Sequence, residues 1–459
     1  MHKLDPRRSL EAFRHIHRGG NLGASPPAVL AAGFLALIAI GTLLLALPFA
    51  SRSAPLGLFE AFFTATAAIT VTGLAIVDPQ QLSLFGQWVM LVLVQVGGLG
   101  FVTFAVVSAI TLGHRISLKQ QSLALEAFNQ TSTARVRDTA LSVLRITAAI
   151  ELSVTLMLFL WWWGSGRLPA GTALYYAIFH AVAAFNNAGY ALFNGNLSTF
   201  TGDGLTIAIL SATVILGGLG FPVIVDALRK KRWTTLPPYA RLMILTALGL
   251  NLLGFVTIWA LEARNPLTLG SLTWADQARA AWMQSVALRT AGFTTFNVEL
   301  MDDSTTLFSA VLMFIGGGSM STAGGIKLGT FVVIMAAVFA YLTQRKEVVV
   351  MQRSISADSI QKALAVAVVS LLTACLGLFL LTVFEDIPFA NLFLEVIAAL
   401  STTGLSHGIT VELSRPSQCV LLVLMFMGRV GPLTLVYSLA VRSRSRNRVR
   451  YPEMEFMVG

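Results

Sequence analysis

The chain has 459 residues, of which 55% are hydrophobic and only 12% charged, and its mean hydropathy is +0.74. A soluble protein normally carries about 25% charged residues, so this composition excludes a water-soluble multidomain protein. Apolar runs at 28–47, 84–112 and 420–441 reach the roughly 20 residues that cross a hydrocarbon core of about 30 Å. We therefore expect a polytopic membrane protein that lies in the lipid bilayer.

The formal net charge of +10 follows a membrane topology, so binding to nucleic acid is not needed to explain it. If the N-terminus is cytoplasmic, 23 of the 32 Lys and Arg residues fall in inside segments and five in external connections. This asymmetry is typical of inside loops, so we expect both termini in the cytoplasm and the protein in the cell's inner (plasma) membrane. The inside segments are 1–25, 113–138, 226–241, 344–362 and 442–459.

The same order of segments occurs four times along the chain. The run 28–47 is followed by a short apolar stretch that ends at residue 69, a turn at 70–74 and a second long run from 84. A stretch of about 13 helical residues is roughly 20 Å long, too short to span. The later copies are 139–163, 172–185, 186–190 and a run from 204; 241–261, 275–288, 289–293 and a run from 305; 362–384, 389–400, 401–405 and 417–441.

Spacing supports an internal repeat, because the central glycines are 116, 103 and 112 residues apart and segment order is the same in each copy. We expect an all-α fold with eight transmembrane helices and four re-entrant pore half helices, in four helix–half-helix–helix (M1-P-M2) repeats with pseudo-fourfold arrangement. The expected repeats are repeat 1 at 26–118, repeat 2 at 139–232, repeat 3 at 236–346 with a broken inner helix, and repeat 4 at 360–442. Residues 1–25 and 443–459 are expected to be a cytoplasmic N-terminal segment and a cytoplasmic C-terminal tail.

We call the four turns at 70–74, 186–190, 289–293 and 401–405 the glycine loops. Irregular backbone survives at membrane depth only where it lines a cavity or is buried in protein, so four such loops on one side indicate a shared axial pathway. Backbone carbonyls can replace the water around a cation, half-helix C-termini add partial negative charge, and glycine allows positive φ. The candidate selectivity-filter residues for K⁺ are Thr70, Val71, Thr72, Gly73, Asn186, Asn187, Ala188, Gly189, Thr290, Ala291, Gly292, Thr402, Thr403 and Gly404.

The glycine loops resemble the four filter loops of the Trk/Ktr/HKT potassium-transporter superfamily. Four further motifs resemble its inner helices: QVGGLGF at 95–101, GGLGFP at 217–222, GGGSMSTAGGIK at 316–327 and MGRVGPLT at 427–434. The resemblance covers essentially the whole chain. Eight spans and the short C-terminal end favour the Ktr-type membrane subunit over the longer Trk type.

The resemblance implies potassium uptake by a homodimer that docks on a cytoplasmic ring of nucleotide-binding, RCK-type regulatory subunits. It implies K⁺ as the transported ion and Na⁺ as a possible coupling ion in symport, with no covalently bound cofactor. A serine in the first loop accompanies sodium preference in the plant branch of the superfamily, and this chain has Gly73 there.

Similarity to the family indicates a gate in the glycine-rich break of repeat 3, which we call the 316–327 loop. Its alternative interpretation is a helix kink, with Lys327 extending towards the cytoplasm. The candidate gate residues are Gly316, Gly317, Gly318, Ser319, Ser321, Thr322, Gly324, Gly325 and Lys327.

Two arginines lie within the expected membrane segments and need partners, because a charge inside the membrane is costly. We expect Arg429 either to bond carbonyls of a neighbouring break or to set an energy barrier, with a structural tie between helices as the alternative. We expect Arg289 to brace the third glycine loop externally.

Other functions fit the sequence less well. An intramembrane serine protease at 317–319 would need a histidine on an inner span, and the G-K-[ST] ending of a nucleotide loop is absent, so we do not expect an enzyme. His180 and His407 lack a second ligand at suitable spacing, so we expect no transition-metal site. The remaining alternatives are a sodium-permeable HKT-like transporter and, more remotely, a broken-helix secondary transporter.

Overall fold

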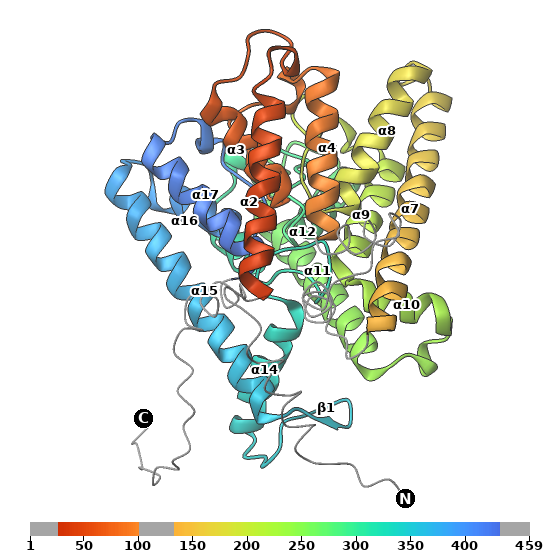
Figure 1. Ribbon diagram of the computed structural model, residues 1–459. Helices are drawn as coiled ribbons and strands as arrows, with labels where there is room; N and C mark the ends of the chain where they lie inside the picture. Colours follow the sequence, from red (N-terminus) through yellow and green to blue (C-terminus); the bar gives the residue numbers. More distant parts are fainter. Residues whose placement is uncertain (1–25, 101–132, 432–459) are drawn as a thin grey trace, which may run out of the picture.

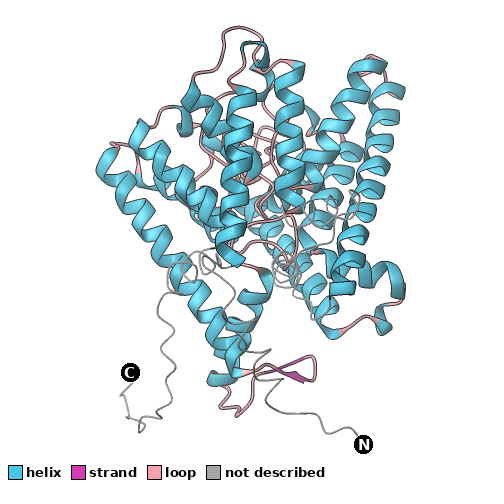
Figure 2. Cartoon of the chain, viewed as in Figure 1, coloured by secondary structure: helices cyan, strands magenta, loops and turns pink. Residues whose placement is uncertain are grey.

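The computed structural model describes residues 26–100 and 133–431 and is built almost entirely of helices (Figures 1 and 2). The expected cytoplasmic segments 1–25 and 443–459, and most of the expected inside segment 113–138, lie outside the described residues.

Each repeat contains a first helix, a half helix and a second helix, in the order expected from the sequence. The expected half helices agree with the observed ones to within about two residues after the first repeat. The helices are α2 (Pro26–Leu45), α3 (Leu58–Ile69) and α4 (Leu84–Leu99); α7 (Thr133–Gly164), α8 (Ala170–Phe185), α9 (Gly204–Leu219) and α10 (Phe221–Lys230); α11 (Pro238–Glu262), α12 (Trp274–Ala287), α13 (Asp303–Phe314) and α14 (Leu328–Leu342); and α15 (Ala357–Phe384), α16 (Phe389–Leu400) and α17 (Arg415–Val430).

Short elements connect these helices. An antiparallel hairpin of β1 (Val349–Val350) and β2 (Arg353–Ser354) joins α14 to α15 at the lower end of the molecule in Figure 1. The 3-10 turns are η1 (Pro48–Ala50), η2 (Pro79–Gln81), η3 (Ser198–Phe200), η4 (Trp233–Thr235), η5 (Val298–Leu300) and η6 (Ile409–Val411).

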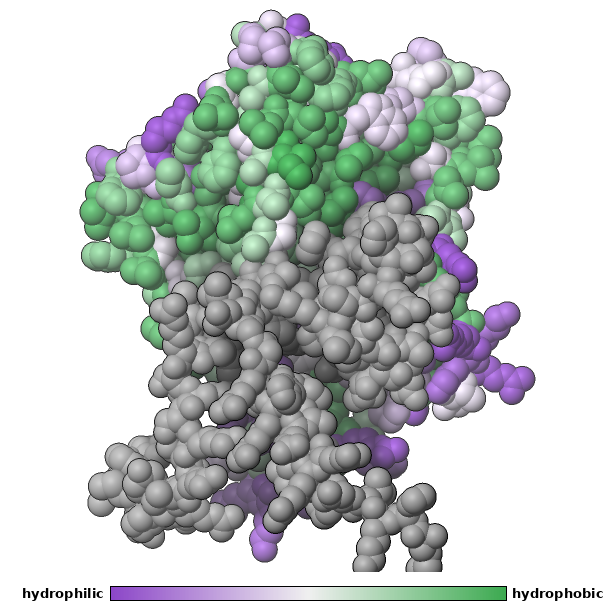
Figure 3. All heavy atoms as spheres, in the orientation of Figure 1, coloured by the Kyte–Doolittle hydropathy of each residue, from purple (hydrophilic) through white to green (hydrophobic). Residues whose placement is uncertain are grey.

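The outer faces of the first helices are apolar. On α7, Leu152, Leu156 and Leu160 are all exposed and follow one another at a spacing of four residues. In a soluble protein such a face would carry polar residues, so this exposure fits contact with lipid. On the face drawn in Figure 3, apolar side chains cover most of the described surface and hydrophilic ones gather towards its two ends.

Among the described residues, which stop at Gly100 after α4 and at Gly431 after α17, length and composition identify fewer spans than the eight expected. Within the described residues, Ala140–Gly164 in α7, all of α11 and all of α15 are long and apolar enough to cross a membrane. The bent pair α9 and α10 adds a fourth if it counts as one span, with an angle of 105° at the break.

The breaks occur at glycines whose backbone leaves the helical region. Gly100 and Gly220 end α4 and α9 with φ of 82° and 98°, at the motifs that resembled glycine breaks. In the expected segment 417–441, α17 ends at Val430 and Gly431 has a φ of 95°, while the rest of the segment lies outside the described residues. Glycine adopts this left-handed region without the clash that a Cβ causes.

Packing between the repeats forms a closed cycle. Each second helix contacts the half helix of the next repeat: α4 packs on α8, α9 on α12, α13 on α16, and α17 on α3. The fourth contact returns the chain to its first repeat. The expected pseudo-fourfold arrangement is therefore present, and it places the ends of the four half helices around one centre.

Asp203 fixes the start of α9, where the chain enters the second long helix of repeat 2. Its carboxylate accepts hydrogen bonds from the N–H and hydroxyl of Thr206 and from Nε1 of Trp161, the last two at 2.7 and 2.8 Å, and it pairs with Arg167 at 3.0 Å. Burial alone would raise the pKa of Asp203, but these hydrogen bonds and the arginine charge hold it below its usual range.

Candidate functional site

The four glycine loops share one backbone conformation. The central glycines Gly73, Gly189, Gly292 and Gly404 have φ of 89°, 70°, 63° and 74°. The residue two positions earlier is also left-handed in every loop, with φ of 57°, 59°, 70° and 52° at Val71, Asn187, Thr290 and Thr402. Left-handed φ is unusual for β-branched residues. Its recurrence in three such residues shows that the surrounding structure imposes the conformation.

The loops meet one another in a ring. A Cβ added to Gly73 would lie 2.5 Å from the carbonyl oxygen of Ala188, and one added to Gly189 would lie 2.7 Å from that of Ala291. The same construction brings Gly292 against the carbonyl oxygen of Thr403, and Gly404 against that of Thr72. Each loop therefore approaches the next one through its backbone, and the fourth approaches the first.

A cavity of about 620 Å³ opens onto this ring. All four central glycines line it, together with polar side chains from the segments that follow the loops, among them Asn196, Asn297 and Glu299. A cation that entered this cavity would meet the carbonyl-rich backbone of all four repeats at once.

Hydrogen bonds from the half helices hold the loops in place. The backbone N–H groups of Thr72, Ala188 and Thr403 each donate to a carbonyl five residues earlier, at 2.9 Å in all three repeats. In repeat 3 the equivalent bond is one residue later, from Gly292 to Ala287 at 3.0 Å. The third glycine loop therefore departs from the symmetry of the others.

The 316–327 loop interrupts the second helix of repeat 3 between α13 and α14. Its two ends are joined by hydrogen bonds from Gly316 N to Ile326 O and from Leu328 N to Gly317 O, both 2.8 Å. The side-chain Nζ of Lys327 donates to the Ala323 carbonyl at 2.6 Å, so this side chain forms a hydrogen bond within the loop itself. A long helix with a simple kink does not describe this compact loop.

Repeat 2 forms the main support of the 316–327 loop. The backbone of Gly318 donates to Gly218 O at 2.8 Å, and Phe221 N donates to Met320 O at 3.1 Å. The Thr322 hydroxyl donates to the carbonyl of Phe185, the last residue of α8, at 3.0 Å. The loop thus lies against the end of a half helix, next to the second glycine loop.

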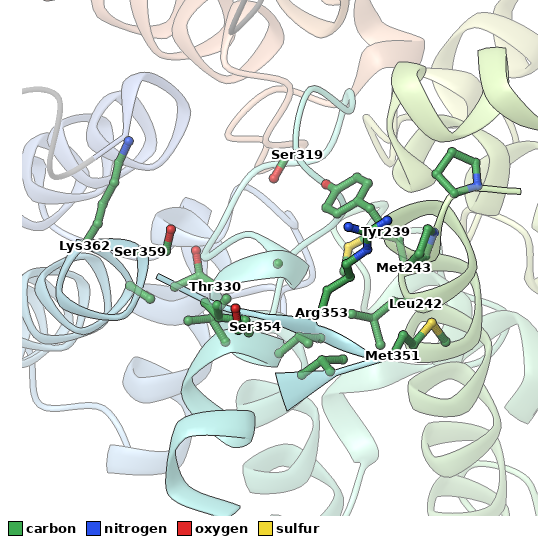
Figure 4. A pocket seen from close by; sticks show the side chains of 18 of the residues that line it. Tyr239, Leu242, Met243, Ser319, Thr330, Met351, Arg353, Ser354, Ser359 and Lys362 are labelled. Carbon is green, nitrogen blue, oxygen red and sulfur yellow. The ribbon is translucent and has the colours of Figure 1, made fainter. Parts of the chain in front are cut away.

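Repeat 4 also contacts this loop. A Cβ added to Gly324 would lie 2.9 Å from the carbonyl oxygen of Ser401. Among the expected gate residues, Ser319 lines a second cavity of about 620 Å³, between α11, α14, α15 and the hairpin (Figure 4). Gly317, Ser321 and Gly325 lie within the loop and complete its turns.

Arg429 ties three repeats together. Its guanidinium donates to the carbonyl oxygens of Thr322, Gly97 and Gly98, the last at 2.9 Å. Gly97 and Gly98 lie in the last turn of α4, so the positive charge also faces a helix C-terminus, where cations are stabilised. The structure therefore places Arg429 against the carbonyls of a neighbouring break, and the same contacts also form the tie between helices that was the alternative expectation.

The expected external brace by Arg289 is wrong. Arg289 is only 7% exposed, and its guanidinium donates to Gly316 O at 2.7 Å. The Arg289 side chain points from the third glycine loop towards the 316–327 loop, where the Gly316 carbonyl provides a partner for its buried charge. Arg289 is thus a direct link between the two.

Sequence reasoning missed the hydrogen-bond partners of three acids, of which Glu262 and Glu395 are fully buried and Glu151 is half-buried. Glu151 on α7 bonds Asn186 and Gln95, Glu395 on α16 bonds the hydroxyl of Thr410, and Glu262 on α11 accepts from Thr268 at 2.5 Å. A carboxyl group inside an apolar segment is the signal that could have identified them.

Comparisons with known proteins agree with this architecture. The family model described as TrkH, cation transport protein, matches residues 25–451. The chain is 43% identical to the Ktr system potassium uptake protein B of Bacillus subtilis over 441 residues, covering 95% of this chain and 97% of that protein. It is 38% identical to the protein of the same name from Vibrio alginolyticus over 436 residues, covering 94% and 95%.

Two further similarities extend the comparison. The chain is 32% identical to the potassium/sodium uptake protein NtpJ of Enterococcus hirae, covering 95% of this chain and 97% of that protein. The crystal structure of the potassium transporter TrkH from Vibrio parahaemolyticus superposes with a TM-score of 0.72 at 18% identity, covering 92% of this chain and 86% of that one. At that identity the superposition shows the fold, and the expected all-helical membrane fold is confirmed.

Proposed function

Because the chain belongs to the TrkH family of cation transport proteins and is similar to its Ktr-type members over nearly its whole length, we propose that it is the membrane subunit of a potassium uptake system. Its relatives are transporters and not enzymes. The observation that carries the proposal is the ring of four glycine loops, in which each central glycine meets a carbonyl of the next repeat.

The ring provides the chemistry that a dehydrated cation requires. Carbonyl oxygens replace the hydration shell of the ion, and the C-terminal ends of α3, α8, α12 and α16 lead into the loops and contribute partial negative charge. We assign potassium binding to the loop residues named above, from Thr70 to Gly73, Asn186 to Gly189, Thr290 to Gly292 and Thr402 to Gly404. No transition metal takes part in this function.

The 316–327 loop is the proposed gate. It is an irregular segment that interrupts the second helix of repeat 3, and hydrogen bonds join it to Arg289, to Arg429 and to the end of α8. Two of these ties end on carbonyls of the loop and the third leads from the Thr322 hydroxyl to the end of α8, so the loop can move when these hydrogen bonds are released.

The names of the relatives support a multi-subunit system, since two of them belong to Ktr systems. The proposed assembly is a homodimer in the cell's inner membrane, with cytoplasmic termini and a cytoplasmic ring of RCK-type subunits. Symport with Na⁺ belongs to the same proposal.

Potassium uptake by cells that lack their own potassium transporters tests the function. We expect cells expressing the chain to grow and accumulate K⁺ at low external K⁺, with weak inhibition by excess NaCl. Equal uptake of Na⁺ would instead favour the sodium-permeable function, to which the name of the Enterococcus relative also points. No potassium uptake, from a chain present in the membrane together with a Ktr regulatory subunit, would contradict the proposal.

A further inference from the structure

The position three residues before each central glycine is not held in the same way in all four repeats. In repeats 1 and 4 it carries a hydroxyl, which bonds the hydroxyl two residues further on: Thr70 to Thr72 and Ser401 to Thr403, both at 2.7 Å. These two glycine loops are therefore braced internally. Repeat 2 cannot form this pair, because Ala188 has no hydroxyl.

In repeat 2 the brace comes from outside the loop. The side-chain nitrogen of Asn186 donates to Oε1 of Gln95 at 2.7 Å and to Oε1 of Glu151 at 3.2 Å. Gln95 in turn donates from Nε2 to the other oxygen of Glu151, also at 3.2 Å. We call Gln95, Glu151 and Asn186 the Glu151 network.

The network joins three elements that are far apart in sequence. Gln95 lies near the end of α4, Glu151 lies on α7, and Asn186 ends α8 and begins the second glycine loop. Asn186 is fully buried, and a Cβ added to Gly98 would overlap its side chain. The amide therefore has little freedom to turn, and its direction is set by the acceptors that it faces.

A carboxyl group suits this place because each of its two oxygens accepts from one of the two amides. Among residues 26–100 and 133–431, no Lys or Arg forms an ion pair with Glu151. The hydrogen-bond partners of Glu151 among these residues are the side-chain amides of Gln95 and Asn186. A carboxylate within an apolar helix is costly, so its retention here indicates a role in directing these donors.

We propose that Glu151 is a positioning residue for the second glycine loop. Acting through Gln95 and Asn186, it fixes the loop so that the Ala188 carbonyl, two residues further on, approaches Gly73, and it thereby helps to set the preference for K⁺ over Na⁺. This inference rests on the proposed function of the ring as a potassium filter.

Glutamine at position 151 keeps the shape of the side chain but replaces one acceptor with a donor. Glu151→Gln would therefore set an N–H₂ group against one of the two amide donors. The double variant Gln95→Glu/Glu151→Gln moves the carboxylate across the network and restores the original number of donors and acceptors. Ser153→Ala is a matched control, because Ser153 is an exposed residue on the same helix whose hydroxyl bonds only Ala149 O.

The experiment measures K⁺ uptake, its inhibition by Na⁺ and membrane abundance for wild type and these variants in cells lacking other potassium transporters. We expect Glu151→Gln and Gln95→Glu each to reduce the preference for K⁺ by about tenfold, the effect of losing a hydrogen bond to a charged group. The double variant should recover the wild-type preference to within about twofold, and Ser153→Ala should match wild type.

Wild-type preference in Glu151→Gln would overturn the inference. So would a double variant that reaches the membrane without recovering the preference, or one that fails to accumulate there, because either outcome would mean that position 151 needs glutamate for another reason. If Glu151→Gln alone fails to accumulate, the double variant decides. Lack of potassium uptake by the wild type would instead overturn the proposed function, and this inference with it.

Discussion

Replacing Gly73 with serine perturbs the ring at its first glycine loop. Gly73 has a φ of 89°, and its added Cβ would lie 2.5 Å from the Ala188 carbonyl oxygen, where ordinary contacts begin at 3.4 Å. The left-handed conformation costs an L-residue roughly 1–2 kcal/mol, and the overlap forces that carbonyl to move. We expect the displaced carbonyl to weaken K⁺ binding by a similar roughly 1–2 kcal/mol, which corresponds to about a 5- to 30-fold loss of preference for K⁺ over Na⁺.

The assay is potassium uptake in transport-deficient cells at increasing NaCl, with membrane abundance measured in parallel. Gly166→Ser is the matched control, because Gly166 has a similar φ of 71° but no atom within 4 Å of an added Cβ. It tests the cost of the backbone conformation alone and should keep the wild-type preference. If Gly73→Ser transports K⁺ with normal sodium discrimination, close approach between the loops does not determine selectivity.

Three further predictions concern the supports of the ring. Thr322→Val removes the hydroxyl bond to the end of α8, so we expect the maximal rate of K⁺ uptake to rise about two- to tenfold at unchanged KM; a lower rate would argue against a gating role. Gly217→Ala introduces a Cβ that overlaps the Phe185 carbonyl and should destabilise the protein by about 1–3 kcal/mol, seen as a lower Tm in detergent, whereas Gly249→Ala, with open space around it in the interior of α11, should leave Tm unchanged or raise it, because alanine favours a helix over glycine. Because the pKa of Asp203 is below its usual range, its stabilising effect is complete above the ordinary carboxyl pKa of about 3.9 and is lost as pH falls below it; Asp203→Asn should flatten the dependence of Tm on pH in this window, and an unchanged slope would contradict the assignment.

The repeats could be predicted because their signals are local. An apolar stretch too short to span, followed by a glycine turn, gave the position of α16 at 389–400 without error. The four similar copies also implied the ring. Both features depend on hydrophobicity and on glycine, which a sequence displays directly.

The conformation of the loops depends on contacts that the sequence does not display. Val71, Thr290 and Thr402 are β-branched residues that disfavour left-handed φ. They adopt it here because hydrogen bonds to the half helices and close packing of neighbouring loops hold the backbone. No local pattern predicts that outcome.

The side-chain links between repeats were harder still. The direction of Arg289 depends on the carbonyl of Gly316, 27 residues away, and the Asn186–Gln95 bond joins residues 91 apart. A sequence suggests that a buried charge has a partner, but it does not say which of many distant carbonyls or amides provides it. The end of α17 at Gly431 was missed for a related reason, since the apolar run continues past the break.

Ion flux through the purified chain most directly tests the claim that the four glycine loops form a potassium-selective pathway. The protein, reconstituted in liposomes with equal sodium on both sides, a potassium gradient and a voltage-sensitive dye, should develop a membrane potential that follows the potassium gradient, and Gly73→Ser should reduce this response. A wild type that gives no potential in a potassium gradient, or an unchanged response in Gly73→Ser, would contradict this account.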